Sequence, residues 1–258
     1  MKKSFLIGMV VLFFASLTAI SAWSADSPGT GSGMNAFEAS WKKDRYALVF
    51  FYAEMDDAIK EKQAGFEAIA AGLKDKADAY FVNIKDPGQR DVVNQYKLDR
   101  APMPLVLVIA PNGAVTGGFP QVFPEQAVKE AILGPLTAQC LKGLQDRKIV
   151  FVCVPGENAE ANISAMKGVK DFTSDKMFEG QTEVVIFKDA GPSEQRLMSI
   201  LGIDGKGVVD PITAMLASPG GMIGKFTGAT DKDTLLTALK SKQQSGGCCP
   251  AGSGKTCK

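Results

Sequence analysis

The chain has 258 residues and a formal net charge of +1, which becomes −1 if a leader carrying Lys2 and Lys3 is removed. A near-neutral protein has no bulk electrostatic attraction for nucleic acid or anionic lipid, and we expect neither as a partner. The sequence contains no histidine. This excludes Ser-His and Cys-His nucleophiles, imidazole metal ligands and histidine acid–base catalysis.

The first 25 residues have the order of a Sec-type signal peptide. Two lysines come first, an apolar run of about 16 residues follows, and small residues close the segment. The alternative is an uncleaved membrane anchor, for which the run is short because a span takes about 20 residues. We therefore expect a periplasmic or secreted protein with no membrane span after cleavage. Residues 26–35 are rich in Gly, Ser, Thr and Pro and should form a flexible leader.

The next part of the chain alternates between strand and helix patterns. Apolar runs predict strands, apolar residues at helical spacing predict helices, and Pro111-Asn112-Gly113 predicts a hairpin turn. The expected elements are a strand over 47–52, a helix over 57–73, a strand over 79–84, a helix over 89–96, strands over 105–109 and 114–119, and a helix over 124–133.

The same order then recurs with almost no residue identity. The expected elements are a strand over 148–154, a helix over 159–172, a strand over 183–187, a helix over 192–201, strands over 212–217 and 222–226, and a helix over 231–241. The β-α-β half implies a parallel pair, and the hairpin adds an antiparallel edge. We therefore expect two domains, 36–137 and 138–243, joined by a short connection near 136–146.

The first strand is followed by the segment Phe51-Tyr52-Ala53-Glu54-Met55-Asp56-Asp57-Ala58-Ile59-Lys60. This segment resembles the active site of the thioredoxin family, whose pattern is aromatic-Ala-Glu-x-Cys-x-x-Cys-Lys, but it lacks the two cysteines. Asp56 and Ile59 stand at the two cysteine positions, and Phe50 replaces the family's buried acid. The resemblance covers about residues 36–240 and implies an α/β fold of two tandem thioredoxin-like domains without a CxxC motif, each with a central mixed β-sheet flanked by helices. A dithiol oxidoreductase needs an attacking thiolate and a resolving thiol, and this site has neither.

The resemblance also implies a cis proline beside the surface that binds extended substrate. In the first domain the candidates are Pro102 and Pro104, between which the sequence does not choose. In the second domain the candidate is Pro211. The alternative is that all three are ordinary loop prolines.

Three acids lie where the first long helix is expected to begin. Glu54, Asp56 and Asp57 have the composition of an acid–base or metal site, but acids at this position also satisfy free amides and favour the helix dipole. We expect capping.

Five cysteines remain after the leader, and an odd number in an oxidising compartment implies a free thiol, an intermolecular bridge or a metal site. Cys153 lies in an apolar strand and should act as a small buried hydrophobe. Cys140 lies near the domain junction, and the sequence leaves open whether it is in the core, at an interface or exposed. It also leaves open a disulfide between Cys140 and Cys153.

The last 15 residues, 244–258, form a Gly-, Ser- and Pro-containing tail that cannot bury a core. Cys248, Cys249 and Cys257 in such a segment indicate reactivity or ligation, for instance of a soft metal such as Cu(I). A tetrahedral zinc site would need a fourth ligand. The alternative is a passive tail in which Cys257 is bridged to one of the adjacent pair.

These observations predict an exported, non-catalytic thioredoxin-fold protein that binds extended peptide or protein partners, with a tail that binds soft metal or thiols. The alternative is a thiol–disulfide redox protein that uses the tail cysteines. If the chain is an enzyme, we expect an oxidoreductase acting through the tail.

Overall fold

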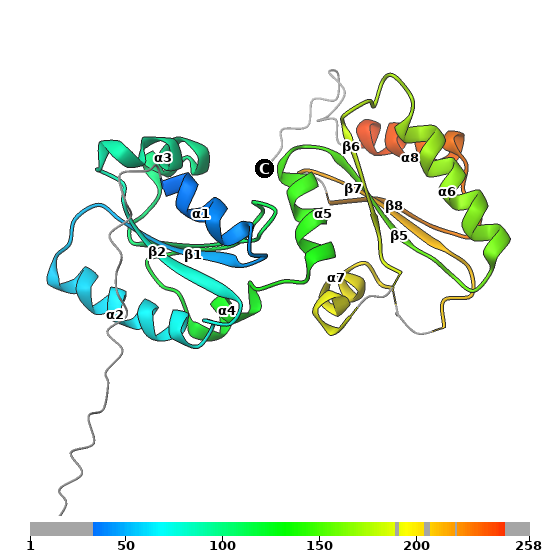
Figure 1. Cartoon of the computed structure of the whole chain (residues 1–258). Helices are drawn as coiled ribbons and strands as arrows, with labels where there is room; N and C mark the ends of the chain where they lie inside the picture. The colour runs from blue at the N-terminus through cyan, green and yellow to red at the C-terminus, as the bar shows by residue number, and fades with distance from the viewer. Residues whose placement is uncertain (1–32, 189–190, 204–206, 220, 246–258) are drawn as a thin grey trace, which may run out of the picture.

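The structure is a computed structural model that describes residues 33–188, 191–203, 207–219 and 221–245. The first domain contains a four-stranded sheet of order β2-β1-β3-β4, and the second contains a four-stranded sheet of order β6-β5-β7-β8 (Figure 1). The signal peptide expected over 1–25 and the cysteine-bearing part of the tail lie outside the described residues. Among the residues that are described, no helix has the length and apolar character needed to cross a membrane.

The first domain has ten short elements. They are α1 (Gly33–Trp41), β1 (Tyr46–Tyr52), α2 (Asp57–Ala71), β2 (Ala77–Asn83), the 3-10 turn η1 (Pro87–Gln89), α3 (Arg90–Tyr96), the 3-10 turn η2 (Leu98–Arg100), β3 (Leu105–Ile109), β4 (Val115–Pro120) and α4 (Glu125–Glu130). β1 pairs in parallel with β2 and antiparallel with β3, and β3 pairs antiparallel with β4.

The second domain repeats this order. Its elements are α5 (Pro135–Gln145), β5 (Ile149–Val154), α6 (Ala159–Thr173), β6 (Thr182–Ile186), the 3-10 turn η3 (Pro192–Glu194), α7 (Gln195–Ile200), β7 (Ile212–Ala217), β8 (Gly221–Thr227) and α8 (Lys232–Ser245). β5 pairs in parallel with β6 and antiparallel with β7, and β7 pairs antiparallel with β8. The chain therefore consists of two tandem thioredoxin-like domains, as the sequence indicates.

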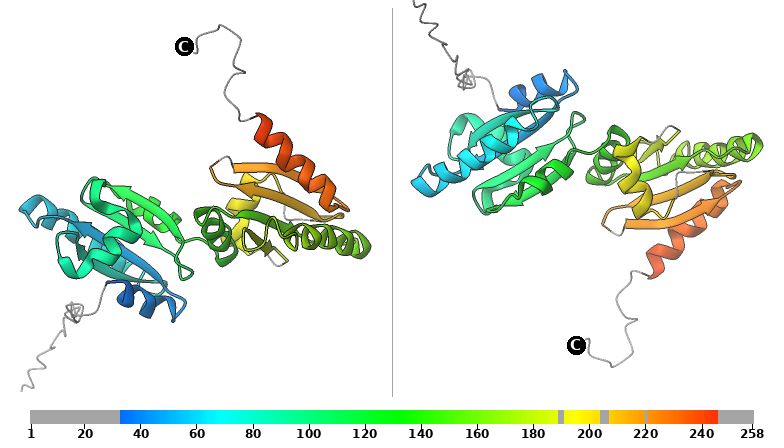
Figure 2. Two further views of the ribbon diagram at one scale, coloured as in Figure 1. Left: turned by 90° about the horizontal axis from the view of Figure 1, so that it is seen from above. Right: turned by 90° about the horizontal axis from the view of Figure 1, so that it is seen from below.

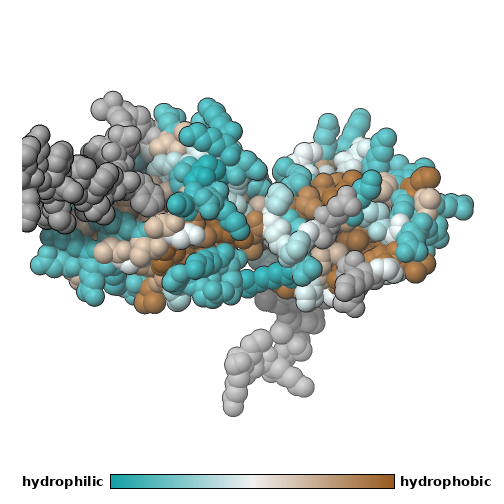
Figure 3. Space-filling view, turned by 60° about the horizontal axis from the view of Figure 1, so that its bottom comes forward, coloured by the Kyte–Doolittle hydropathy of each residue, from teal (hydrophilic) through white to brown (hydrophobic). Residues whose placement is uncertain are grey.

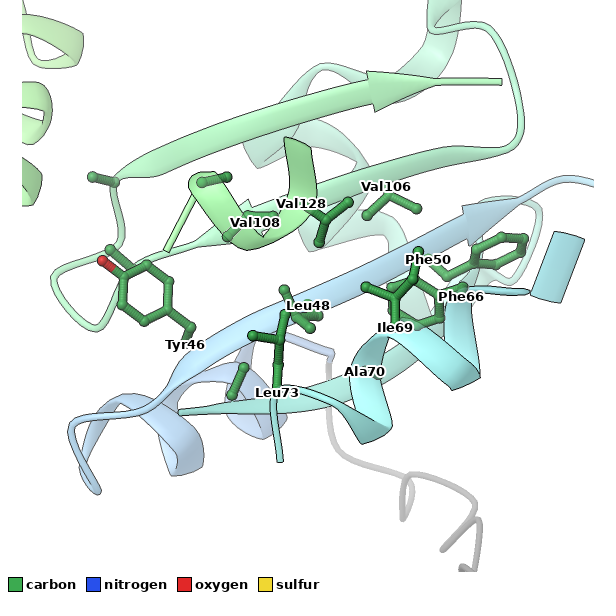
Figure 4. Close-up of a cluster of buried hydrophobic side chains, with 14 of the residues drawn as sticks. Tyr46, Leu48, Phe50, Phe66, Ile69, Ala70, Leu73, Val106, Val108 and Val128 are labelled. Carbon is green, nitrogen blue, oxygen red and sulfur yellow. The ribbon is translucent and has the colours of Figure 1, made fainter. Parts of the chain in front are cut away.

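Each sheet is buried on both faces, which explains its continuous apolar strands. In β1, Leu48 and Phe50 point to the cluster covered by α2 and α4, as Figure 4 shows. Val49 and Phe51 point to the opposite cluster, covered by α1 and α3. Successive residues of a strand face opposite sides, so an unbroken apolar run supplies two layers of core.

Most expected bounds differ from those of the structure by a few residues, and α8 extends to Ser245, inside the tail expected over 244–258. Two other differences, in the leader and at the domain junction, concern the kind of structure formed. Residues 33–35 of the expected leader form the first turn of α1, because Phe37 on this helix reaches the core. The expected short connection near 136–146 is a helix, α5, which lies between the two sheets (Figure 2).

Helix α5 contributes to both domains. Ala138 and Leu141 pack in the cluster of the first domain, whereas Cys140 and Leu144 pack in a cluster of the second. The hydroxyl of Tyr46 on β1 donates to the carbonyl of Leu133 just before the helix, at 2.7 Å. The boundary expected between residues 137 and 138 falls inside this shared helix.

Candidate functional site

The two positions that carry cysteines in thioredoxins have structural roles here. Asp56 is the N-cap of α2, and its side chain accepts a hydrogen bond from the amide of Ile59 at 2.8 Å. Ile59 is half-buried and packs against the core cluster beneath α2. The expected capping role of Asp56 is confirmed, and neither position carries a group able to attack a disulfide.

The other two acids of this segment point to separate lysines. Glu54 pairs with Lys85 at 2.5 Å, and the hydrogen bond from Lys85 lowers the pKa of the Glu54 carboxyl. Asp57 pairs with Lys60 at 2.9 Å. Within the part of the chain that is described, no group of three or more acids and cysteines is arranged to hold a metal ion. Glu54 and Asp57 are therefore each held in an ion pair with a lysine.

Phe50, at the position where the resemblance implies a buried acid, belongs to an aromatic cluster in the core of the first domain. It is fully buried, and its ring centroid lies 5.5 Å from that of Phe66 and 6.0 Å from those of Phe81 and Phe123. An aromatic cluster of this kind contributes dispersion and area burial but carries no proton. The interior behind the loop is therefore apolar.

The proline loop of the first domain directly precedes β3. The Met103–Pro104 peptide bond is cis, and the bond before Pro102 is not. Pro104 lies beside the end of β1, because Phe51 is the register partner of Leu105.

In the second domain the expectation at Pro211 does not hold. The cis bond of this domain is Ser218–Pro219, in the turn between β7 and β8. Pro211 occupies the position equivalent to Pro104, directly before β7, but its loop is held by the loop after β5. The amide of Glu157 donates to Val208 and the amide of Asn158 donates to Val209, at 2.9 and 3.0 Å. These bonds fix the backbone ahead of Pro211.

The loop of the first domain is open by comparison, because within the described residues the carbonyls of Ala101 and Pro102, at the positions equivalent to Val208 and Val209, have no hydrogen-bond partner. Within the described residues, neither the amide nor the carbonyl of Met103 has a hydrogen-bond partner. Exposed apolar side chains accompany it on neighbouring loops: Met55 after β1 is 38% exposed and Val122 after β4 is 70% exposed. The turn before Val122 is held by a bond from the Gln121 amide to Pro104 and by one from Lys62 to the Gln121 carbonyl, at 2.6 and 3.0 Å.

The equivalent surface of the second domain is covered by its own backbone. Besides the two amide bonds, the side chain of Asn158 donates to Asp210 at 3.2 Å. The loops approach so closely that a Cβ on Gly156 would lie 2.5 Å from the carbonyl oxygen of Val209. No extended segment can reach these carbonyls without displacing the loop after β5.

The two described cysteines are free and buried. Cys140 packs on one face of the second sheet and Cys153 packs on the other, so a bridge between them is excluded. Burial raises the pKa of each thiol to about 12, and the negative charge of Glu194 contributes at Cys140. The expected buried role of Cys153 is confirmed. Cys248, Cys249 and Cys257 lie outside the described residues.

Sequence reasoning missed Met103 and Val122 as members of the open surface. A methionine and a valine beside prolines look like ordinary loop residues, and only the backbone pairing of the finished fold shows which loop keeps unpaired groups.

Comparisons with known proteins found similar solved structures. No family model and no curated protein matches the chain. Chloroplastic thioredoxin z is 16% identical, with a TM-score of 0.32 over 39% of this chain and 87% of that one. Thioredoxin from Fasciola hepatica is 16% identical, with a TM-score of 0.32 over 40% of this chain and 93% of that one. Thioredoxin O1 from Arabidopsis thaliana is 15% identical, with a TM-score of 0.30 over 35% of this chain and 78% of that one.

Proposed function

We propose that the protein is an exported, non-catalytic thioredoxin-fold protein whose first domain binds extended peptide segments of partner proteins. The binding surface comprises Met55, Met103 and Val122. The observation that carries this proposal is the unpaired backbone of Met103 beside exposed apolar side chains.

The chemistry of these groups matches an extended peptide. An extended segment presents an amide and a carbonyl at regular spacing and can pair with free backbone groups, while its alternate side chains enter apolar surface. Unpaired groups beside apolar surface are expensive to bury unless the ligand pairs with them. We therefore expect this surface to prefer peptides with apolar side chains over peptides with charged side chains.

Absence of redox chemistry in the folded domains is part of the proposal. The cysteine positions hold Asp56 and Ile59, and the two described thiols are protonated at neutral pH because burial raises their pKa values. A chain ending at Lys242 should not reduce insulin above background. Turnover by that chain, lost when Cys140 or Cys153 is changed to Ser, would contradict the non-catalytic assignment.

The binding surface is tested with peptides selected from a random heptapeptide phage library on the chain without its signal peptide. Val122→Asp should weaken the selected peptides by about tenfold, because a charge then faces apolar contact. Ile163→Asp is the matched control: Ile163 on α6 is 72% exposed, close to the 70% of Val122, and its substitution should leave the affinity unchanged. Equal binding by wild type and Val122→Asp would refute this surface.

For the tail we propose thiol or soft-metal binding through Cys248, Cys249 and Cys257. The supporting observation is that both other cysteines are buried, which leaves thiol chemistry at neutral pH to the tail. The reduced full-length protein should bind about one equivalent of Cu(I), and replacement of the three tail cysteines by Ser should abolish binding.

A reversible tail disulfide without metal binding would favour the redox alternative. Three thiols that are bridged, hard to reduce and free of metal would overturn both. Intact and alkylated masses of the protein from the exported fraction also fix its N-terminus.

A further inference from the structure

A second surface, separate from the proline loop, lies at the junction of the two domains. It is a groove of about 430 Å³ between β4 and α4 of the first domain and α5 and α7 of the second. Its volume falls within the range of about 300–1,000 Å³ that is typical of ligand sites. The residues used below are Gly118, Phe119, Ala131, Leu197 and Ile200. In Figure 3 hydrophobic surface is visible on both domains.

The floor of the groove is an edge strand, because β4 is the last strand of its sheet. The backbone groups of Pro104 and Ala110 face β4, since Pro104 accepts from Gln121 and Ala110 donates to Ala114. Because the backbone groups of a strand alternate in direction, the amide and carbonyl of Val106 on β3 also point to β4, toward its register partner Phe119. The next residue, Gly118, turns its amide and carbonyl to the open side.

The open side of Gly118 has no partner within the described residues. Gly118 is exposed, and no hydrogen bond reaches its outward amide or carbonyl. Three residues earlier on the same side, the side-chain amide of Gln145 pairs with Val115 in the manner of a strand: it accepts from the Val115 amide at 3.0 Å and donates to the Val115 carbonyl at 2.7 Å. The outward backbone groups of β4 are thus paired at Val115 and unpaired at Gly118.

The second domain protects the equivalent edge. Phe226, Lys225 and Gly224 of β8 pair with β7 as Phe119, Gly118 and Gly117 of β4 pair with β3. Lys225, at the position of Gly118, is exposed, and its ammonium donates to the carbonyl of Gly202 at 3.0 Å. A lysine on an edge strand resists pairing with another chain. The first domain lacks this protection beside an apolar groove.

The walls restrict what can enter. Phe119, Ala131 and Leu197 are apolar, and Ile200 is 71% exposed, which is unfavourable unless a partner covers it. The charged side chains at the groove, Arg196 and Glu130, pair with each other across the junction at 3.6 Å. An occupant therefore meets apolar walls and one strand-like donor–acceptor pair, rather than an unpaired charge.

We propose that this groove binds an extended apolar segment of a partner protein by strand addition to β4 at Gly118. The segment accepts from the Gly118 amide and donates to its carbonyl, and its side chains cover Leu197 and Ile200. This site is independent of the peptide surface around Met103, because the two share no residue.

The probe is acetyl-Thr-Val-Leu-Val-Thr-amide, titrated to millimolar concentration into the 15N-labelled chain without its signal peptide. We expect the Gly118 amide resonance to shift and its hydrogen exchange to slow on binding. The same peptide with methylated nitrogens on its three apolar residues should bind about tenfold more weakly or not at all, because its apolar residues can then no longer donate to the Gly118 carbonyl. Equal binding of the two peptides would overturn strand addition.

Two variants locate the site. Gly118→Lys installs the solution found in the second domain, and Ile200→Asp places a charge on the apolar wall. Each should weaken binding of the unmethylated peptide by about tenfold. Ile163→Asp, at 72% exposure on α6, is the matched control for Ile200→Asp and should bind as wild type does. Circular dichroism confirms that each variant is folded.

Further outcomes would also overturn the proposal. They are no binding by wild type, unchanged binding by both groove variants, and loss of binding only in Val122→Asp, which would assign the peptide to the proline-loop surface. Self-association of the free protein that Gly118→Lys abolishes, measured by sedimentation, would also overturn it, because the occupant would then be a second copy.

Discussion

The carboxylate of Glu194 is the most deeply buried charged group at the domain junction. Its side chain is 2% exposed, and its two oxygens accept from the first turn of α5. One oxygen accepts from the Leu136 amide at 3.0 Å, and the other accepts from the amide of Thr137 at 2.9 Å and from the Thr137 hydroxyl. Helix α5 lacks a capping side chain of its own, since its N-cap is Gly134. Glu194 performs that function from 57 residues away.

Glu194→Gln should destabilise the protein by about 2–3 kcal/mol. Glutamine offers an NH2 group where one carboxylate oxygen accepted, so one buried amide of α5 loses its partner, at about 1–3 kcal/mol. Loss of a negative charge at a partly buried helix N-terminus adds up to about 2 kcal/mol, offset in part because a neutral side chain is easier to bury. For a chain of this length the shift in Tm is about 5–10 °C.

Gly134→Ala should act through the same carboxylate. The backbone of Gly134 has a φ of −73°, which alanine adopts easily, but a Cβ there would lie 2.1 Å from the Glu194 Oε1. The measurement is urea unfolding of Gly134→Ala, of Glu194→Ala and of the double variant, in which the clash with the Glu194 side chain is gone. We expect a strongly non-additive cycle. Glu160→Gln in the first turn of α6 is the control, because Glu160 is exposed. A Glu194→Gln variant as stable as this control would refute the capping role.

Three further outcomes are expected. Cys140 and Cys153 should resist a thiol reagent at pH 8 until the protein is unfolded, and early labelling would contradict their burial. Burial raises the pKa of both thiols from 9 to about 12, so their contribution to stability is full below pH 9 and is lost as the pH rises toward 12. Asp56→Ala should cost about 1 kcal/mol in urea unfolding through loss of the α2 cap, and no change would contradict that role. A fragment over 134–245 should be more stable to heat than one over 138–245, which lacks the first turn of α5; equal stability would argue against the Glu194 contact.

Local sequence determined most of the secondary structure. The strands Leu105–Ile109 and Ile212–Ala217 have the bounds that their apolar runs predict, because a strand buried on both faces consists mainly of apolar residues. The cap at Asp56 was also predictable, since a capping bond spans only three residues. The repeated order of strands and helices then restricts the topology to a few possibilities, of which a β-α-β unit with a hairpin is one.

Helix α5 shows where local reasoning was incomplete. Pro135 at its first turn and apolar residues at Leu136, Cys140 and Leu144 form a helical pattern, yet the segment was expected to be a short connection. Its amides are satisfied by Glu194 and its faces are divided between two cores, and both facts depend on residues far along the chain.

The candidate sites were decided by tertiary structure. The sequence offers Pro104 and Pro211 as equivalents, but the carbonyls of Val208 and Val209 are occupied by the loop after β5, whereas those of Ala101 and Pro102 at the equivalent positions have no partner among the described residues. Likewise, the sequence alone shows Gly118 and Lys225 as two different residues and does not indicate that they occupy equivalent positions. Their equivalence, and the exposure of an unpaired edge at one of them, arises from strand register, which is set by the packing of whole sheets. Which backbone groups remain free is a property of the assembled sheet, since each group's partner lies on another strand.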